Sequence, residues 1–162
     1  MDECPGVRLD KVIDSLSHAQ LDHIAEQLSV VLAEMRSLTS GTLGSVSGGP
    51  YLNLHHAYPL NPSRAFSTLL SVFRRDDAMH FAHGDLLPRN ILVEGSTVTA
   101  IVDWETAGFY PAFWEYCRMH DRNWRVPGWD YVLSRVFPGC RRTAEIGAMD
   151  ELMAILAFEV YG

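Results

Sequence analysis

The sequence contains few cysteines and no long apolar run. Its three cysteines, Cys4, Cys117 and Cys140, are scattered and show no CxxC spacing. This pattern excludes a disulfide framework and predicts reduced thiols in an intracellular protein. No stretch approaches the roughly 18 apolar residues of a membrane span, and the acidic start MDECPGVRLD has no apolar signal core. We therefore expect a cytoplasmic protein with no membrane partner.

Positive charge is also scarce. Lys and Arg total 13 against 20 Asp and Glu, which gives a net charge of −7. A nucleic-acid surface needs clustered Lys and Arg, and only Arg74-Arg75 and Arg141-Arg142 are paired here. We therefore predict no nucleic-acid partner. A hydrophobic content of 48% with 20% charged residues argues against disorder and fits one folded domain, or one lobe of a larger one.

The first half of the chain combines helical patterns with a long irregular connection. Residues 17–38 predict an amphipathic helix, because Ser17 and Gln20 have capping-box spacing and apolar residues then recur at helical intervals. Residues 39–63 are rich in Gly, Ser and Pro and predict an irregular loop, for which a lid or substrate-facing role is open. Its glycines match neither GxGxxG nor GxxxxGK[ST], so they do not indicate a phosphate-binding loop. A second helix is expected over residues 63–75.

The second half predicts a β-hairpin followed by helices. Short strands are expected at residues 79–82, 91–94 and 98–104, and the turn at 94–97 joins the last two. Helices are expected near 113–121, 128–137 and 144–161, separated by Pro127 and Pro138-Gly139. The predicted fold class is α+β and mostly helical, with several helices around one small hairpin.

The polar residues beside this hairpin carry the chemistry. Asp85 and Asn90 lie on the loop before one strand, and Asp103 ends the strand that pairs back against it. A hairpin of this length should bring the three side chains together. Asn90 and Asp103 offer the hard oxygen ligands that suit Mg²⁺, which leaves Asp85 to accept a proton from an attacking hydroxyl. Phosphoryl transfer needs this combination of groups.

Two motifs make a resemblance specific. The segment HGDLLPRN at 83–90 matches the HxDxxxxN catalytic loop of the aminoglycoside phosphotransferase and choline kinase-like families, which are relatives of the protein kinases. The segment IVDWE at 101–105 resembles the metal-binding segment of the same families. GFYPAFWEY and GSVSGGPY are similar to the variant found in many fungal members. The resemblance extends from CPGVRLD to about Tyr116.

The resemblance implies a role for individual residues. The implied set is Asp85 as catalytic base, His83 as the residue that braces the catalytic loop, Asn90 and Asp103 as Mg²⁺ ligands, Leu92 as the floor of the adenine pocket, and residues 1–5 as the hinge that meets adenine. Arg89 is either a phosphate contact or a surface residue. Leu87 stands where related sequences commonly have His. The implied reaction transfers the γ-phosphoryl group of ATP, with Mg²⁺, to the hydroxyl of a small molecule.

Residues 1–162 contain no match to the nucleotide-clamping parts of such an enzyme. A glycine-rich loop and a strand lysine paired with a helix glutamate normally hold the phosphates, but the single lysine, Lys11, comes after the hinge position. We therefore expect residues 1–162 to form a kinase-like C-lobe without its N-lobe, with little or no phosphotransfer alone. The surface that would meet an N-lobe should be apolar and recruit a protein partner or drive self-association.

Other interpretations stay open at this stage. One is a non-catalytic, kinase-like binding module (a pseudoenzyme), and another is a metal hydrolase using His80, His83, Asp85 and Asp103, although an i,i+3 pair on a strand faces opposite ways. Aromatic residues Trp104, Trp114 and Tyr116 are expected in the core. The acidic residues Glu115, Asp121 and Asp130 are either contacts for a cationic sugar or solvated surface positions.

Overall fold

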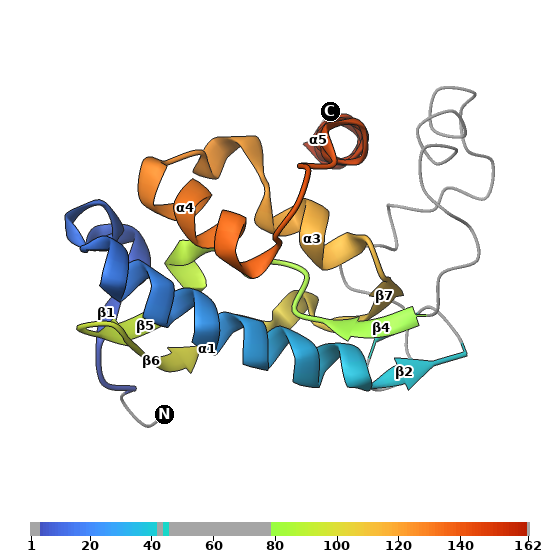
Figure 1. The fold of residues 1–162 in the computed structure, drawn as a ribbon. Coiled ribbons are helices and arrows are strands. Elements are labelled where there is room, and N and C mark those ends of the chain that lie inside the picture. Colours follow the sequence, from blue (N-terminus) through green and yellow to red (C-terminus); the bar gives the residue numbers. More distant parts are fainter. Residues whose placement is uncertain (1–3, 42–43, 46–78, 162) are drawn as a thin grey trace.

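The computed structural model describes residues 4–41, 44–45 and 79–161, with side chains up to residue 154. The predicted helix over 63–75, most of the loop over 39–63 and the first three hinge residues lie outside this part. The described chain forms helices and two small antiparallel sheets (Figure 1). The α+β class is therefore confirmed.

The first long helix, α1 (His18–Ser37), begins where the sequence predicts. The Ser17 backbone N–H donates to Gln20 Oε1 at 3.0 Å, and the Gln20 N–H donates to Ser17 Oγ at 3.4 Å. This capping box provides side-chain acceptors for two amides at the N-terminal end of the helix. The buried face of α1 is apolar and comprises Leu21, Ile24, Ala25, Leu28, Leu32 and Met35.

The predicted hairpin belongs to a three-stranded sheet with strand order β1-β5-β6. Its strands are β1 (Val7–Arg8), β5 (Ile91–Glu94) and β6 (Thr97–Ile101), and Ile91 pairs with Ile101. The hairpin is confirmed, but β6 ends before Trp104. Asp103 has a left-handed backbone conformation, with φ 65° and ψ 57°, and Trp104–Thr106 forms a 3₁₀ turn. That conformation cannot continue a strand.

A second sheet was not predicted. Its strand order is β2-β4-β7-β3, built from β2 (Thr39–Ser40), β4 (Met79–Ala82), β7 (Gly108–Pro111) and β3 (Gly44–Ser45). The strand prediction for 79–82 is confirmed. The expectation of one hairpin alone is therefore wrong. β7 was not predicted because its sequence is GFYP, and both Gly and Pro are unfavourable in strands.

Three helices complete the described fold: α3 (Trp114–Met119), α4 (Pro127–Val136) and α5 (Thr143–Tyr161). All three fall within two residues of their predicted bounds. One hydrophobic cluster joins α1, α4 and the hairpin and includes Leu28, Ile91 and Trp129; another joins α3, β7 and α5 and includes Tyr116 and Met149. Figure 1 shows α1 beside the β5–β6 hairpin at one end and beside β4 at the other.

The described helices include none that is long and apolar enough to cross a membrane. The three cysteines are free thiols: Cys4 and Cys140 are exposed and Cys117 is buried. Burial raises the pKa of the Cys117 thiol to about 12, with smaller contributions from neighbouring charges. Cys117 therefore behaves as an apolar core residue at neutral pH.

Candidate active site

The segment with the catalytic-loop motif, residues 83–90 (hereafter the catalytic loop), connects β4 to β5 and is largely buried. His83 is 0% exposed and Asn90 4%, and the apolar Leu86 and Leu87 are both 0% exposed. The loop closes with a 3₁₀ turn over Pro88–Asn90, in which the Asn90 N–H donates to the Leu87 carbonyl at 2.8 Å. The two leucines therefore anchor the loop in the core.

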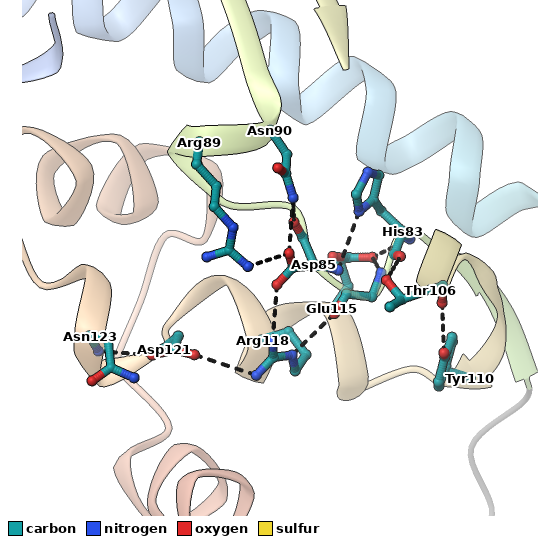
Figure 2. Close-up of polar contacts among 11 residues, drawn as sticks. His83, Asp85, Arg89, Asn90, Thr106, Tyr110, Glu115, Arg118, Asp121 and Asn123 are labelled. Atoms are coloured by element: carbon teal, nitrogen blue, oxygen red, sulfur yellow. Dashed lines mark hydrogen bonds and ion pairs between the residues drawn. The ribbon is translucent and has the colours of Figure 1, made fainter. Parts of the chain in front are cut away.

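Asp85 is held by three side chains (Figure 2). Arg118 donates to Asp85 Oδ1 at 3.0 Å, and Arg89 forms an ion pair with Asp85 Oδ2. The Asn90 amide nitrogen donates to Oδ2 and to the Asp85 carbonyl, both at 2.9 Å. Both carboxylate oxygens are therefore engaged, and the orientation of the carboxylate is fixed.

His83 ties the catalytic loop to the end of β6. Its Nδ1 accepts from the Asp85 N–H at 3.2 Å, so its Nε2 carries the proton and donates to the Val102 carbonyl at 3.0 Å. Burial lowers the pKa of His83, although the Val102 carbonyl and the charges of Asp85 and Asp103 favour its protonated form. A neutral His83 with both ring nitrogens satisfied braces the loop.

Asp103 lies next to Asn90 in the backbone ladder. The Val102 N–H donates to the Asn90 carbonyl at 2.9 Å, and Asp103 follows directly. It is the one non-glycine residue with positive φ among the described residues, and its side chain is exposed. Asp tolerates this conformation better than most residues, yet sparsely populated backbone conformations concentrate at functional sites. The outlier therefore marks Asp103 as a functional candidate.

Asn90 and Asp103 carry oxygen atoms of the type that Mg²⁺ prefers. The Asn90 NH₂ group donates to Asp85, which leaves its carbonyl oxygen as a hard ligand. Mg²⁺ is usually bound through one or two protein oxygens and completed by water and phosphates. Within the described chain there is no group of three His, Cys, Asp or Glu that could hold a metal. His80 Nδ1 contacts the Arg36 carbonyl at 2.7 Å instead, so the metal hydrolase interpretation gains no support.

Glu115, at the start of α3, supports the catalytic loop, a role that the sequence analysis did not predict for it. Its Oε2 accepts the N–H groups of His83 at 2.6 Å and Gly84 at 3.1 Å. Glu115 is 6% exposed, so the prediction of a solvated position is wrong for it. Burial raises the pKa of the Glu115 carboxyl, and the N–H groups together with Arg118 partly offset this effect. The apolar residues around it in AFWEYC were the available signal of burial.

Arg118 supports the same loop one helical turn later. Besides Asp85, its Nε donates to the Gly84 carbonyl at 3.1 Å, and Nη1 approaches Asp121 at 3.4 Å. Glu115 and Arg118 are three residues apart, which places them on one face of α3. That spacing was the only signal in the sequence for Arg118, and nothing local indicated which loop it would contact.

Gly84 allows the close packing between the loop and the segment after Asp103. Its φ is +82°, and an added Cβ would lie 2.9 Å from the Thr106 carbonyl oxygen. The Thr106 hydroxyl in turn donates to the His83 carbonyl at 2.8 Å. A side chain at position 84 would therefore push the two segments apart.

The aromatic and acidic residues considered in the sequence analysis differ in how deeply they are buried. Trp114 and Tyr116 are buried, as predicted, whereas Trp104 is 41% exposed and its assignment to the core is wrong. Trp104 follows the left-handed Asp103, and its ring lies beside that of His83, with centroids 4.5 Å apart and the planes tilted by 55°. Asp121 is mostly buried against Arg118, and Asp130 is a surface residue paired with Arg141.

A family comparison agrees with this geometry. A model of the phosphotransferase enzyme family, APH, matches residues 1–137. The chain belongs to this family. The family predicted from the catalytic-loop motifs is therefore confirmed. No curated protein matches the chain.

One solved structure similar to this phosphotransferase-family chain is the "GDP complex of wild-type aminoglycoside 2'-phosphotransferase-IIIa". The two sequences are 14% identical, and the match covers 97% of this chain and 69% of the other, with a TM-score of 0.49. Such a distant likeness does not indicate a substrate.

The burial of two histidines indicates that the stability of this protein depends on pH. Burial lowers the pKa of both His83 and His120 from 6.5. Below that value the unfolded chain binds protons that the folded chain excludes. The free energy of unfolding should therefore fall as pH decreases from 7.5 to 5.5, by up to about 1.4 kcal/mol per pH unit for each histidine. Urea unfolding at several pH values measures this slope.

The variant His120→Gln isolates one of the two contributions. The raised pKa of Glu115 acts with the opposite sign, but it is common to both proteins and cancels in the comparison. The slope for His120→Gln should be clearly shallower than that of the wild type. Equal slopes would show that the folded chain protonates His120 freely.

Proposed function

We propose that this chain is the catalytic lobe of a phosphotransferase that moves the γ-phosphoryl group of ATP to a hydroxyl of a small molecule. The observation that carries the proposal is the convergence of Asp85, Asn90 and the Asp103 backbone at the junction of the catalytic loop and the hairpin. Membership of the phosphotransferase family supports it. A cytoplasmic location stays a prediction.

The residues divide the work as follows. Asp85 orients the acceptor hydroxyl and takes its proton as the oxygen attacks the γ-phosphorus; one P–O bond forms, and the bond to the departing ADP breaks. Asn90 and Asp103 would hold Mg²⁺, which supplies positive charge to the phosphate oxygens when bound. Half-buried Leu92 on β5 is proposed as the adenine floor. His83, Glu115 and Arg118 keep the loop in place.

The structure also favours a second candidate. Arg89 and Arg118 engage both oxygens of Asp85, so neither oxygen is free to contact an acceptor hydroxyl in this arrangement. A non-catalytic module that holds a nucleotide, a metal or a protein partner would have such an arrangement. Phosphotransfer to a hydroxyl acceptor would exclude the second candidate. We expect little or no turnover by this chain alone, so a lack of turnover agrees with both candidates.

A thermal melt with and without Mg²⁺-ATP tests the nucleotide site. A ligand at 100 times its dissociation constant should stabilise the fold by about 2.7 kcal/mol. The wild type should shift and Asp103→Asn should not, because the amide removes a charged Mg²⁺ ligand while Asn still tolerates the left-handed backbone. Asp130→Asn, at a surface ion pair, is the matched control and should shift as the wild type does. A folded wild type without any shift would contradict the proposal.

A further inference from the structure

The two arginines that contact Asp85 differ in how many of their guanidinium nitrogens already have a partner. Arg118 is committed: its three nitrogens contact Gly84, Asp85 and Asp121, and its side chain is 13% exposed. Arg89 uses only Nη2, on Asp85, and its side chain is 35% exposed. Its remaining guanidinium N–H groups make no hydrogen bond with the part of the chain that the structure describes. Arg89 is therefore the cation that can meet a ligand.

The position of Arg89 is fixed on the side of α3. Its guanidinium carbon lies 5.3 Å from the ring centroid of Trp124, which ends the 3₁₀ turn after α3. Figure 2 shows the side chain descending from the catalytic loop toward Asp85 and the α3 segment. Leu92, the proposed adenine contact, lies instead on β5, where it pairs with Arg8 and Ala100. Arg89 therefore lies beside Asp85 and Trp124, on the α3 side of the catalytic loop.

The side chains that form ion pairs with Asp85 are both arginines, although the whole chain carries a net charge of −7. The nearby acidic residues have other partners: Asp121 pairs with Arg118, and Glu115 accepts backbone N–H groups of the catalytic loop. A cationic acceptor that approaches Asp85 would be repelled by the two guanidinium groups paired with the Asp85 carboxylate. An anionic acceptor could instead accept hydrogen bonds from the unused N–H groups of Arg89.

We propose that the acceptor is an anionic hydroxyl compound, with a carboxylate or phosphate close to the reacting hydroxyl, and that Arg89 binds this anionic group. The inference rests on the proposed phosphotransfer. Arg89 exchanges Asp85 Oδ2 for the acceptor anion, and the released oxygen then takes the hydroxyl proton. The planar guanidinium suits both anions, because it donates two parallel hydrogen bonds to either.

The test titrates four small molecules into the ¹⁵N-labelled full chain: glycerate, glycerol 3-phosphate, glycerol and choline. The indole N–H signal of Trp124, assigned with Trp124→Phe, reports binding beside Arg89. The two anions should shift this signal, whereas glycerol and choline should not. The relative affinities of glycerate and glycerol 3-phosphate then show whether the site prefers a carboxylate or a phosphate.

Variants at Arg89 decide whether that residue is responsible. Arg89→Gln should weaken anion binding by about tenfold or more, since a charge-assisted pair is lost. The anion affinity of Arg89→Lys should lie between those of the wild type and Arg89→Gln, because lysine keeps the charge and loses the forked geometry. Arg135→Gln, which removes an exposed ion pair with Asp22 on the α1–α4 surface, should leave binding unchanged.

Other results would overturn the inference. These are binding of choline in preference to the anions, no response to any of the four molecules, and anion binding that survives Arg89→Gln. A loss of the Mg²⁺-ATP shift in Arg89→Gln with anion binding intact would assign Arg89 to the nucleotide instead. A wild type that binds the anions through Arg89 but ignores Mg²⁺-ATP would contradict the proposed function and leave the anion site standing.

Discussion

Replacing Glu115 with alanine is expected to lower the free energy of unfolding by about 2–5 kcal/mol, because two buried backbone donors lose their acceptor. Those donors are the N–H groups of His83 and Gly84, at 2.6 and 3.1 Å from Glu115 Oε2. Urea unfolding measures the loss. Hydrogen exchange of the two amides should accelerate at the same time, which would place the effect in the catalytic loop.

Two further variants make the Glu115 result interpretable. Glu115→Gln keeps a carbonyl oxygen for the two amides and should retain a large part of the stability. Glu26→Ala removes an exposed glutamate from α1 and should change stability by no more than about 0.5 kcal/mol. Removing a buried carboxylate can also stabilise a protein when its desolvation outweighs its hydrogen bonds. A Glu115→Ala chain as stable as the wild type would show that the second effect dominates here.

The substitution Trp129→Ala is expected to cost about 3–5 kcal/mol, the range found when a large aromatic residue is removed from a core. Trp129 is 1% exposed and belongs to the cluster that contains Leu86 of the catalytic loop and Ile91, which directly follows the loop. Its indole Nε1 donates to the Met119 carbonyl at 2.9 Å, at the end of α3. Its loss would therefore leave both a cavity and a buried acceptor. Urea unfolding measures the cost.

Two tryptophan controls separate packing from hydrogen bonding. Trp129→Phe keeps most of the apolar contact but loses the N–H bond, so its cost should be clearly smaller than that of Trp129→Ala. Trp104→Ala removes a tryptophan that is 41% exposed and should cost less than half as much. Similar losses of unfolding free energy for Trp104→Ala and Trp129→Ala would show that the hydrophobic cluster joining α1, α4 and the hairpin does not dominate the stability.

Local patterns in the sequence were sufficient for much of the fold. The capping box at Ser17 and Gln20, the apolar spacing of α1 and the tight turn of the β5–β6 hairpin depend on residues a few positions apart. The order of HGDLLPRN and IVDWE identified the family in the same way. Interactions between near neighbours in the chain are fixed by short-range geometry, and periodicity reports that geometry directly.

The second sheet and the support of the catalytic loop depended on contacts between distant segments. β7 is a strand because β4 and β3 pair with it on its two sides, despite its Gly and Pro. Glu115 and Arg118 reach His83 and Asp85 across 32 and 33 positions. The sequence indicated the candidate site residues Asp85, Asn90 and Asp103, since their types and spacing are local. The folded chain alone determined the partners of Asp85 and the burial of Glu115, because the packing of α3 under the catalytic loop leaves no periodic trace in the sequence.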